Sequence, residues 1–208
     1  MINANYIFAQ VPKTYNSTLF DISFEYPSDW YVPPSLLADN SSLINEPNDE
    51  RNLFLSDPRI IDLGLMSYAQ IAQICPSSPN VTANGNCLQS GKDGDTVLVE
   101  QYYLGGFNSS PSLEEYTDYN IKRIKEDFAN FTITSSSSAN FAGLPAHQVE
   151  YMFKDGDTER KRIEIWTNQN RSGYNIAYIP ASPGQQGFSD EVQQIIKSFK
   201  INKERYYS

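Results

Sequence analysis

The chain has 208 residues, of which 39% are hydrophobic and 20% are charged, and its formal net charge at pH 7 is −9. This length suits one domain with a sizeable core, and the acidity argues against nucleic-acid binding, because phosphate contacts need a basic surface. It also disfavours attraction to anionic lipid head groups, although an acidic surface serves equally to keep a protein soluble. No apolar run reaches the roughly 18 residues that a membrane-spanning helix needs.

The N-terminal end is polar and lacks a regular apolar pattern, so residues 1–18 are predicted to be a flexible segment. Met1 to Gln10 has no basic stretch followed by an apolar core, as a signal peptide would. The chain is therefore either cytoplasmic or the mature form of an exported protein with an added initiator Met. A half-buried strand is predicted next, from the alternating apolar residues Phe20, Ile22, Phe24 and Tyr26.

The middle of the chain carries weaker patterns. Residues 33–51 contain three prolines, which is typical of a long loop, and residues 52–56 are a short strand candidate. The apolar spacing of residues 62–74 fits a strand as well as a helix. Residues 97–103 alternate again and predict a strand that ends at Gly105-Gly106.

A helix is predicted from Leu113 to about Asp127. Ser112 and Glu115 have the spacing of a capping box, in which each side chain bonds the other's backbone N–H. The apolar stripe of this helix is formed by Leu113, Thr117, Ile121, Ile124 and Phe128. A further strand begins near Phe131 and runs into the serine tract 135–138, which is expected to be an exposed strand end or a turn.

Residues 143–201 give the clearest pattern, three strands and a closing helix. Asp155-Gly156-Asp157 is typical of a tight hairpin turn, and a second turn is predicted near Asn170. The strand faces are marked by alternating apolar residues at Val149, Tyr151 and Phe153, then Ile163 and Ile165, then Tyr174, Ile176 and Tyr178. The helix has an N-cap at Ser189 and an apolar stripe of Phe188, Val192, Ile195, Ile196 and Phe199.

These elements predict an α+β fold, an antiparallel β-sheet flanked by helices in an α/β/α sandwich. We expect one domain over residues 19–201 and a C-terminal tail over residues 202–208.

Three short motifs resemble the PsbP-like family: YPSDW at Tyr26–Trp30, AGLPA at Ala142–Ala146 and IIKSFKI at Ile195–Ile201. Their order and spacing extend the resemblance over most of the chain, although residues 57–96 match no motif. The family is related in fold to the accessory PsbP subunit of photosystem II and to a small Ran-binding nuclear import factor. The resemblance implies the same sandwich, with a strand within residues 62–74. It does not by itself imply a photosynthetic role.

The only two cysteines, Cys75 and Cys87, flank a loop rich in Pro, Ser, Asn and Gly, which predicts a disulfide that closes the loop near residues 75–95. A two-cysteine metal site is the alternative, but no His or third Cys lies near. Disulfides persist in oxidising compartments. Six N-x-S/T sequons are candidate glycosylation sites in an exported chain, at Asn16, Asn40, Asn80, Asn108, Asn130 and Asn170. An archaeal secreted member of the PsbP-like family would fit this extracytoplasmic setting.

No catalytic residue is predicted. The one histidine, His147, lies at the start of a strand and is interpreted as a partly buried residue beside a turn. Glu150 and Glu164 lie on neighbouring predicted strands and are interpreted as part of a solvated sheet face, with Arg162 nearby. The alternative is a carboxylate pair, in which the two acids face each other. No cofactor is predicted. The sequence predicts no metal site beyond one candidate surface calcium site formed by Asp155, Asp157 and Glu159, which have the acids but not the usual spacing.

Two further groups are candidate binding surfaces. The aromatic residues Tyr102, Tyr151 and Trp166 are interpreted as core, with a surface patch as the alternative. The basic run Arg160-Lys161-Arg162 is interpreted as a solvated edge that resists aggregation, with an acidic partner as the alternative.

The sequence therefore predicts a non-enzymatic, secreted or cell-surface protein that acts as an accessory or interaction module of a cell-envelope complex, with a protein partner there. Two alternatives stay open, a module that binds a small ligand or metal and a hydrolase that uses carboxylates.

Overall fold

The structure is a computed structural model that describes residues 11–17, 20–31, 67–76, 95–104, 110–128 and 130–202. Its helices are α4 (Leu113–Asp127) and α5 (Asp190–Ser198). Its strands are β1 (Lys13–Ser17), β2 (Ile22–Tyr26), β3 (Trp30–Tyr31), β4 (Ser67–Pro76), β5 (Thr96–Tyr103), β6 (Thr132–Phe141), β7 (Leu144–Asp155), β8 (Thr158–Gln169), β9 (Ser172–Ile179) and β10 (Lys200–Ile201).

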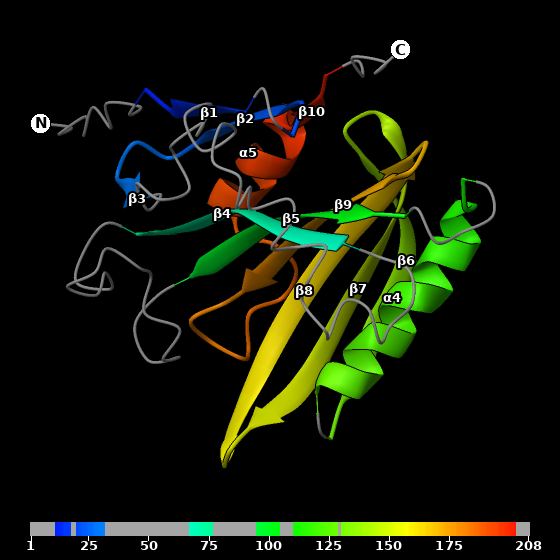
Figure 1. The fold of residues 1–208 in the computed structure, drawn as a ribbon. Coiled ribbons are helices and arrows are strands. Elements are labelled where there is room, and N and C mark those ends of the chain that lie inside the picture. The colour runs from blue at the N-terminus through cyan, green and yellow to red at the C-terminus, as the bar shows by residue number, and fades with distance from the viewer. Residues whose placement is uncertain are drawn as a thin grey trace, which may run out of the picture.

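The strands form two sheets. Among the described residues, the large sheet has seven strands in the order β3-β4-β5-β9-β8-β7-β6, and the small sheet has three in the order β1-β2-β10. Every pairing is antiparallel. The large sheet lies at the centre, with α4 over one face and α5 between the other face and the small sheet (Figure 1). The predicted α+β sandwich is therefore confirmed, with the small sheet as an outer addition.

Tight turns join β6, β7, β8 and β9 into one meander. Gly156 follows the last residue of β7 and has a φ of 61°, a conformation that glycine adopts without the strain a Cβ would cause. Asn170 turns the chain between β8 and β9 with a φ of 55°, and asparagine tolerates this region better than most residues. Both predicted hairpins are confirmed.

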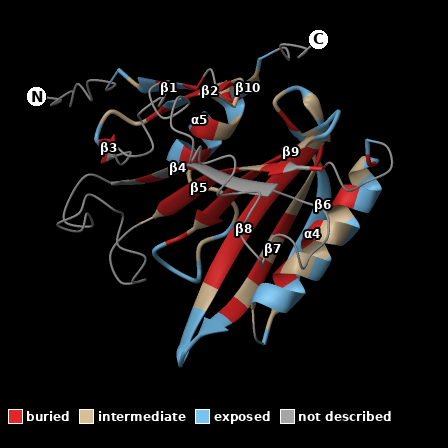
Figure 2. Cartoon of the chain, viewed as in Figure 1, coloured by how far each residue is buried: buried red, intermediate tan, exposed pale blue. Residues whose placement is uncertain are grey.

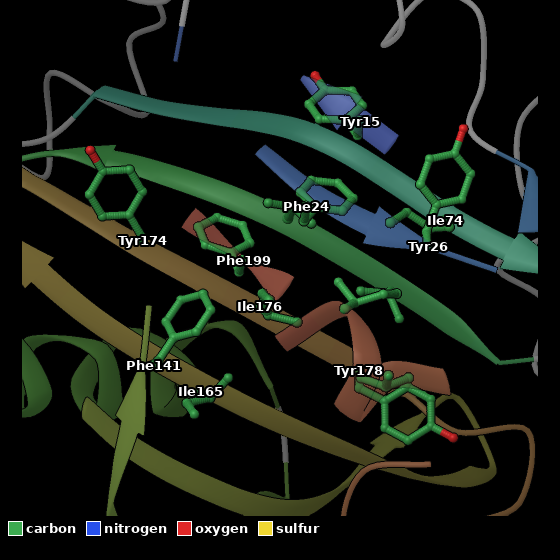
Figure 3. Packing of buried hydrophobic residues seen from close by; sticks show 14 of the residues in the cluster. Tyr15, Phe24, Tyr26, Ile74, Phe141, Ile165, Tyr174, Ile176, Tyr178 and Phe199 are labelled. Atoms are coloured by element: carbon green, nitrogen blue, oxygen red, sulfur yellow. The ribbon is translucent and has the colours of Figure 1, made fainter. Parts of the chain in front are cut away.

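The face of the large sheet that α5 covers is apolar. Val192 and Ile195 of α5 are buried against Ile163 and Ile165 of β8. Aromatic rings from both sheets fill the layer around the end of α5 (Figure 3): the ring of Phe24 stacks on that of Tyr15 at 4.8 Å between centroids and on that of Phe199 at 5.7 Å. The predicted N-cap is present, because Ser189 Oγ accepts the backbone N–H of Val192.

The opposite face packs on α4. Ser112 and Glu115 form both bonds of the predicted capping box, 2.7 and 3.2 Å long. Tyr116 and Ile124 of α4 are fully buried against a cluster that includes Tyr151 and Trp166. Buried residues run along the middle of β8 and β9, whereas the tip of the β7–β8 hairpin is exposed (Figure 2).

The structure corrects the predicted N-terminal boundary. Residues 13–17 belong to β1, which pairs with β2 along its whole length, so the segment predicted to be flexible to residue 18 contains a strand. Its short apolar pattern was too weak to detect, since only Tyr15 and Ser17 are buried in it. The strand implied within residues 62–74 is present from Ser67 onward. The predicted loop 33–51 and strand 52–56 lie outside the described residues.

Candidate functional site

A set of polar side chains lies buried between α4 and the large sheet, and we call it the α4-face network. It consists of Glu100 and Tyr102 of β5, Asn175 of β9, Arg162 and Glu164 of β8, Tyr151 of β7 and Arg123 of α4. Side chains on one face of a sheet alternate along each strand, and β5, β9, β8 and β7 are neighbours. The six sheet residues therefore form one patch, and Arg123 reaches it from the helix above.

Glu164 is the centre of this network and its side chain has no solvent exposure. One carboxylate oxygen, Oε1, lies 2.8 Å from Arg162 Nε and accepts the Tyr151 hydroxyl at 2.5 Å. The other, Oε2, accepts Arg123 Nη2 at 3.1 Å and Asn175 Nδ2 at 2.7 Å. The Nε–H of Arg162 is not aimed along its short contact, so that pair is electrostatic. Each carboxylate oxygen thus has two polar partners.

A second buried acid joins the network from β5. Glu100 Oε2 accepts Asn175 Nδ2 at 2.9 Å and the Tyr102 hydroxyl at 3.2 Å. Its Oε1 lies 3.7 Å from Arg162 Nη2. Asn175 and Arg162 therefore bridge the two carboxylates, and two buried positive charges accompany two buried negative ones.

The charges of Glu164 and Arg162 are maintained at neutral pH by their neighbours. Burial alone would raise the pKa of Glu164, but Arg162 and Arg123, with hydrogen bonds from Tyr151 and Asn175, outweigh it and lower the pKa to about 2. Burial likewise opposes the charge of Arg162, but Glu164 and other partners raise its pKa above the ordinary value. Burial and then the neighbouring Glu164 raise the pKa of the Tyr151 hydroxyl. At neutral pH Glu164 is a carboxylate and Tyr151 is a phenol.

These states determine what the network can do chemically. An ionised carboxylate that already accepts hydrogen bonds and lies between guanidinium groups cannot donate a proton near neutral pH, and its lone pairs are engaged. The network instead ties α4 to the sheet. Two further bonds act in the same way: Trp166 Nε1 donates to Thr117 Oγ1 at 3.0 Å, and Asn168 Nδ2 donates to the carbonyl oxygen of Pro111 at 2.7 Å.

The interpretation of Glu150 and Glu164 as part of a solvated sheet face is wrong for Glu164, whose side chain has no solvent exposure. The alternative, a carboxylate pair, is wrong as well. Glu164 lies opposite Val149 in the β7–β8 register, and Glu150 lies opposite Ile163. Neighbours one position apart point to opposite faces, so Glu150 projects toward the α5 side. There it forms an ion pair with Lys161, 2.7 Å long.

The predicted solvated basic run is also wrong at two of its three positions. Lys161 and Arg162 have 4% and 8% of their surface exposed and pair with buried or half-buried acids on opposite faces of the sheet. The run looked like an edge because it is charged, but β8 is an interior strand between β9 and β7. Arg160, which is half-buried, pairs with Asp155 at 3.0 Å.

His147 is half-buried in β7, as interpreted from the sequence. Its Nε2 lies 2.8 Å from Ser136 Oγ on β6, and its ring lies 5.6 Å from that of Trp166. Partial burial lowers the pKa of His147, so the imidazole is neutral at pH 7. Ser136 is exposed on β6, the outermost strand at this end of the large sheet. The His147–Ser136 pair is not part of the α4-face network.

The candidate calcium residues do not assemble. Asp155 is engaged by Arg160, and Glu159 lies opposite Lys154 in the hairpin. Within the described ranges, no three His, Cys, Asp or Glu side chains lie close enough together to hold a metal ion. Asp157 is exposed in the turn itself.

Three of the six sequons lie on described residues, and all three asparagines are exposed: Asn16 in β1, Asn130 before β6 and Asn170 in the β8–β9 turn. Asn40, Asn80 and Asn108 lie outside the described residues. So does Cys87, and the disulfide with Cys75 stays a prediction. In the part of the chain that the structure describes, no helix is long and apolar enough to span a bilayer.

The aromatic residues Tyr102, Tyr151 and Trp166 are buried core, as interpreted from the sequence. A shallow depression lies elsewhere, between β2 and α5. Its lining is polar and consists of Glu25, Asp190, Gln193, Gln194, Lys197 and Ser198.

The sequence analysis missed Glu100, Arg123 and Asn175 as network members. One indication was present for Arg123, since it follows Tyr116 and Asn120 at spacings of four and three along one helix face. Glu100 sits between Leu98 and Tyr102 on one strand face in the same way. A charged residue in an apolar period is a sign of a buried pair, but its partner cannot be identified from spacing.

No protein-family model matches the chain, and no curated protein matches it. Among solved structures, the chain is similar to LpqN of Mycobacterium tuberculosis, a protein involved in cell envelope biogenesis: the TM-score is 0.53 at 12% identity over 95% of this chain and 88% of that one. Cyanobacterial PsbP from Synechocystis sp. PCC 6803 matches with a TM-score of 0.49 at 11% identity, over 97% of this chain and 98% of that one. The likeness to LpqN shows a shared fold alone, and the score of the second match carries no argument. Nothing in these matches supports an archaeal source.

Proposed function

We propose that this protein is a non-enzymatic module that works outside the cytoplasm, as an accessory or interaction partner in a cell-envelope complex. The observation that carries the proposal is the state of its interior acids. Glu164 and Glu100 are buried within a network of arginine, tyrosine and asparagine side chains. Glu164 attaches α4 to the sheet through Arg123, whereas Glu100 is held by Arg162 and Asn175 within the sheet. A fold whose buried charges are engaged in this way offers its surface, rather than its interior, for function.

The carboxylate-dependent hydrolase is disfavoured by the same geometry. A general acid needs a raised pKa, whereas the pKa of Glu164 is lowered. Its proposed companion, Glu150, points to the other face of the sheet and pairs with Lys161. These two acids therefore cannot share one substrate.

The ligand-binding module has less support than the interaction module. The depression between β2 and α5 is lined by polar side chains, whereas small-molecule sites are usually enclosed and mostly apolar. Asp155, the first of the candidate calcium residues, already forms an ion pair with Arg160.

The extracytoplasmic location rests on two supports. The fold is shared with LpqN, which is involved in cell envelope biogenesis, and this is an argument by analogy. The exposed asparagines Asn16, Asn130 and Asn170 are accessible to a glycosylation enzyme. Both fit the predicted disulfide, which would form in an oxidising compartment.

The test is fractionation of the cells that produce the protein, followed by chemical cross-linking, purification and mass spectrometry of the full chain. We expect the chain in the envelope or extracellular fraction, with Cys75 joined to Cys87, at least one sequon modified and a reproducible envelope protein attached. A reduced, unmodified chain that cross-links only to cytoplasmic proteins would overturn the proposal.

A further inference from the structure

Strand β6 forms one edge of the large sheet among the described residues. An edge strand presents alternate backbone N–H and C=O groups that no neighbouring strand pairs. Natural proteins usually block such an edge with charged side chains, with proline, with a bulge or with a covering element. The surroundings of β6 therefore show whether its edge is blocked.

Within the described part of the chain, β6 carries few of these blocking features. Its ten residues, TITSSSSANF, include neither a charged residue nor a proline. A single irregularity in its pairing with β7 lies between Ile133 and Ser135, and from Ser135 to Phe141 the register is continuous. The bulge thus disturbs one end of the strand, and the serine run keeps a continuous register.

Both faces of β6 are open along most of its length. Every residue from Thr132 to Ser138 is exposed. These residues lie on both faces of the sheet, since Ile133 pairs with Tyr151 and Thr132 pairs with Met152 on the other face. Neither α4 nor α5 buries the side chains of these seven residues. A strand added at the usual separation of about 4.8 Å would therefore meet no side-chain layer.

The geometry points to β6 as a docking edge for an extended segment of a partner protein, which adds as a further strand of the large sheet. This inference rests on the proposed function and names the surface through which it acts. Backbone bonds give such strand addition its affinity, and side-chain contacts give it specificity. The small serine side chains leave the backbone of Ser135–Ser138 accessible.

Charge decides which occupant is favoured. The chain carries a net charge of −9, so a second copy placed edge to edge would bring two strongly acidic molecules together. The strand itself is uncharged and does not oppose a neutral or basic segment. The partner segment is therefore an extended stretch with neutral or basic side chains.

One apolar contact defines an end of the site. Ile133 is 38% exposed and lies opposite Tyr151 in the β6–β7 register. The rings of Tyr151 and Phe131 meet nearby at 5.1 Å in an edge-on contact. A residue of the added strand opposite Ile133 would have its Cβ about 5 Å away. The segment is therefore expected to carry an apolar residue at this end and polar or small ones beside the serines.

The first step of the test places the photo-reactive residue p-benzoylphenylalanine at Ser137 of the full chain in the cells that produce it. A matched chain carries the same residue at Gln194, which is exposed on α5. Illumination of the Ser137 chain is expected to join it to one peptide of another envelope protein. A synthetic peptide of that sequence is the probe for the second step.

In the second step, the probe peptide is expected to slow hydrogen exchange of backbone amides within residues 132–141. The double variant Ser135→Lys, Ser137→Lys should weaken its binding about tenfold or more, because edge lysines oppose strand addition. The control Gln186→Lys, Gln194→Lys adds the same charge at two exposed positions outside β6 and should bind the peptide as the unaltered chain does. The exchange measurement uses the unaltered chain, so it decides the question even if a variant misfolds.

Cross-links from Ser137 to a second copy of this chain would overturn the inference, as would binding that is unchanged by the two lysines or exchange that is unchanged in β6. An envelope partner could instead be joined through Gln194 alone, or be found by general cross-linking but through neither photo-reactive position. Either result would overturn β6 as the docking edge and leave the proposed function standing. A chain found only among cytoplasmic proteins would overturn both.

Discussion

The two faces of the large sheet hold their helices by different means. Among the described residues, the buried cluster on the α5 side has 18 hydrophobic residues, whereas the cluster on the α4 side has 8 and surrounds the α4-face network. Apolar burial is non-directional and scales with area, so it stabilises α5 without fixing one exact contact. Ion pairs and hydrogen bonds are directional, so they set the position of α4 through Arg123.

The difference matters for energetics as well as geometry. Burying paired charges gives little net stability, because desolvation offsets the attraction between them. Breaking such a pair is costly, because the partner stays buried without compensation. Truncating a buried side chain on the α5 side should therefore lower the free energy of unfolding by the amount expected from the lost volume. Truncating a member of the α4-face network should lower it by more than the lost volume predicts.

The largest effect is expected from Glu164→Ala, which leaves Arg162 and Arg123 buried without their shared partner. We expect the free energy of unfolding to fall by about 3–5 kcal/mol, measured by urea denaturation followed by circular dichroism. Lys122→Ala is the control, since it removes a 3.8 Å pair with Glu126 whose side chains are 75% and 52% exposed, and it should change stability by less than about 0.5 kcal/mol. Equal small effects of the two changes would mean that the α4-face network is solvated.

A comparable loss is expected on acidification. The pKa of Glu164 is lowered from 4.5 to about 2 by its folded-state partners, so its contribution to stability is complete above pH 4.5 and is lost as pH falls toward 2. The loss amounts to about 3 kcal/mol by linkage. Glu164→Gln cannot titrate, so the difference in unfolding free energy between the unaltered chain and this variant should shrink over that range. A difference that is independent of pH would contradict the assignment.

A smaller effect is expected from Gly173→Ala, also on the α4 side. A Cβ at this position in β9 would overlap the hydroxyl and the ring of Tyr116. The forced shift of α4 should cost about 1–3 kcal/mol, measured by thermal unfolding. The matched change Gly184→Ala meets its nearest atom, Ser182 Oγ, at 3.7 Å and should have little effect. Equal stability of the two variants would show that α4 moves freely.

The smallest effect is expected from Ile195→Val on the α5 side, where the side chain is completely buried. Loss of one methylene in an apolar layer should cost about 0.5–1.5 kcal/mol, and the acid dependence of unfolding should stay that of the unaltered chain. Urea denaturation across the same pH range measures both quantities. A cost larger than that of Glu164→Ala would reverse the contrast between the two faces.

Local features of this protein were predictable from its sequence. The caps at Ser112 and Ser189 and the turns at Gly156 and Asn170 depend on residues within a few positions of each other. The alternation of apolar and polar residues identified the strand face that carries Val149, because this pattern also depends only on residues close together in the sequence.

Only the tertiary structure determined which charged residues meet. Asn175 and Glu100 are 75 residues apart and meet because β9 pairs with β5. No local sequence pattern predicts this pairing. The register of β7 with β8 separated Glu150 from Glu164, since a shift of one residue exchanges the faces of a strand. The burial of Arg162 likewise followed from the interior place of β8 in the sheet. Periodicity assigns a residue to a face, whereas strand order and register decide what that face touches.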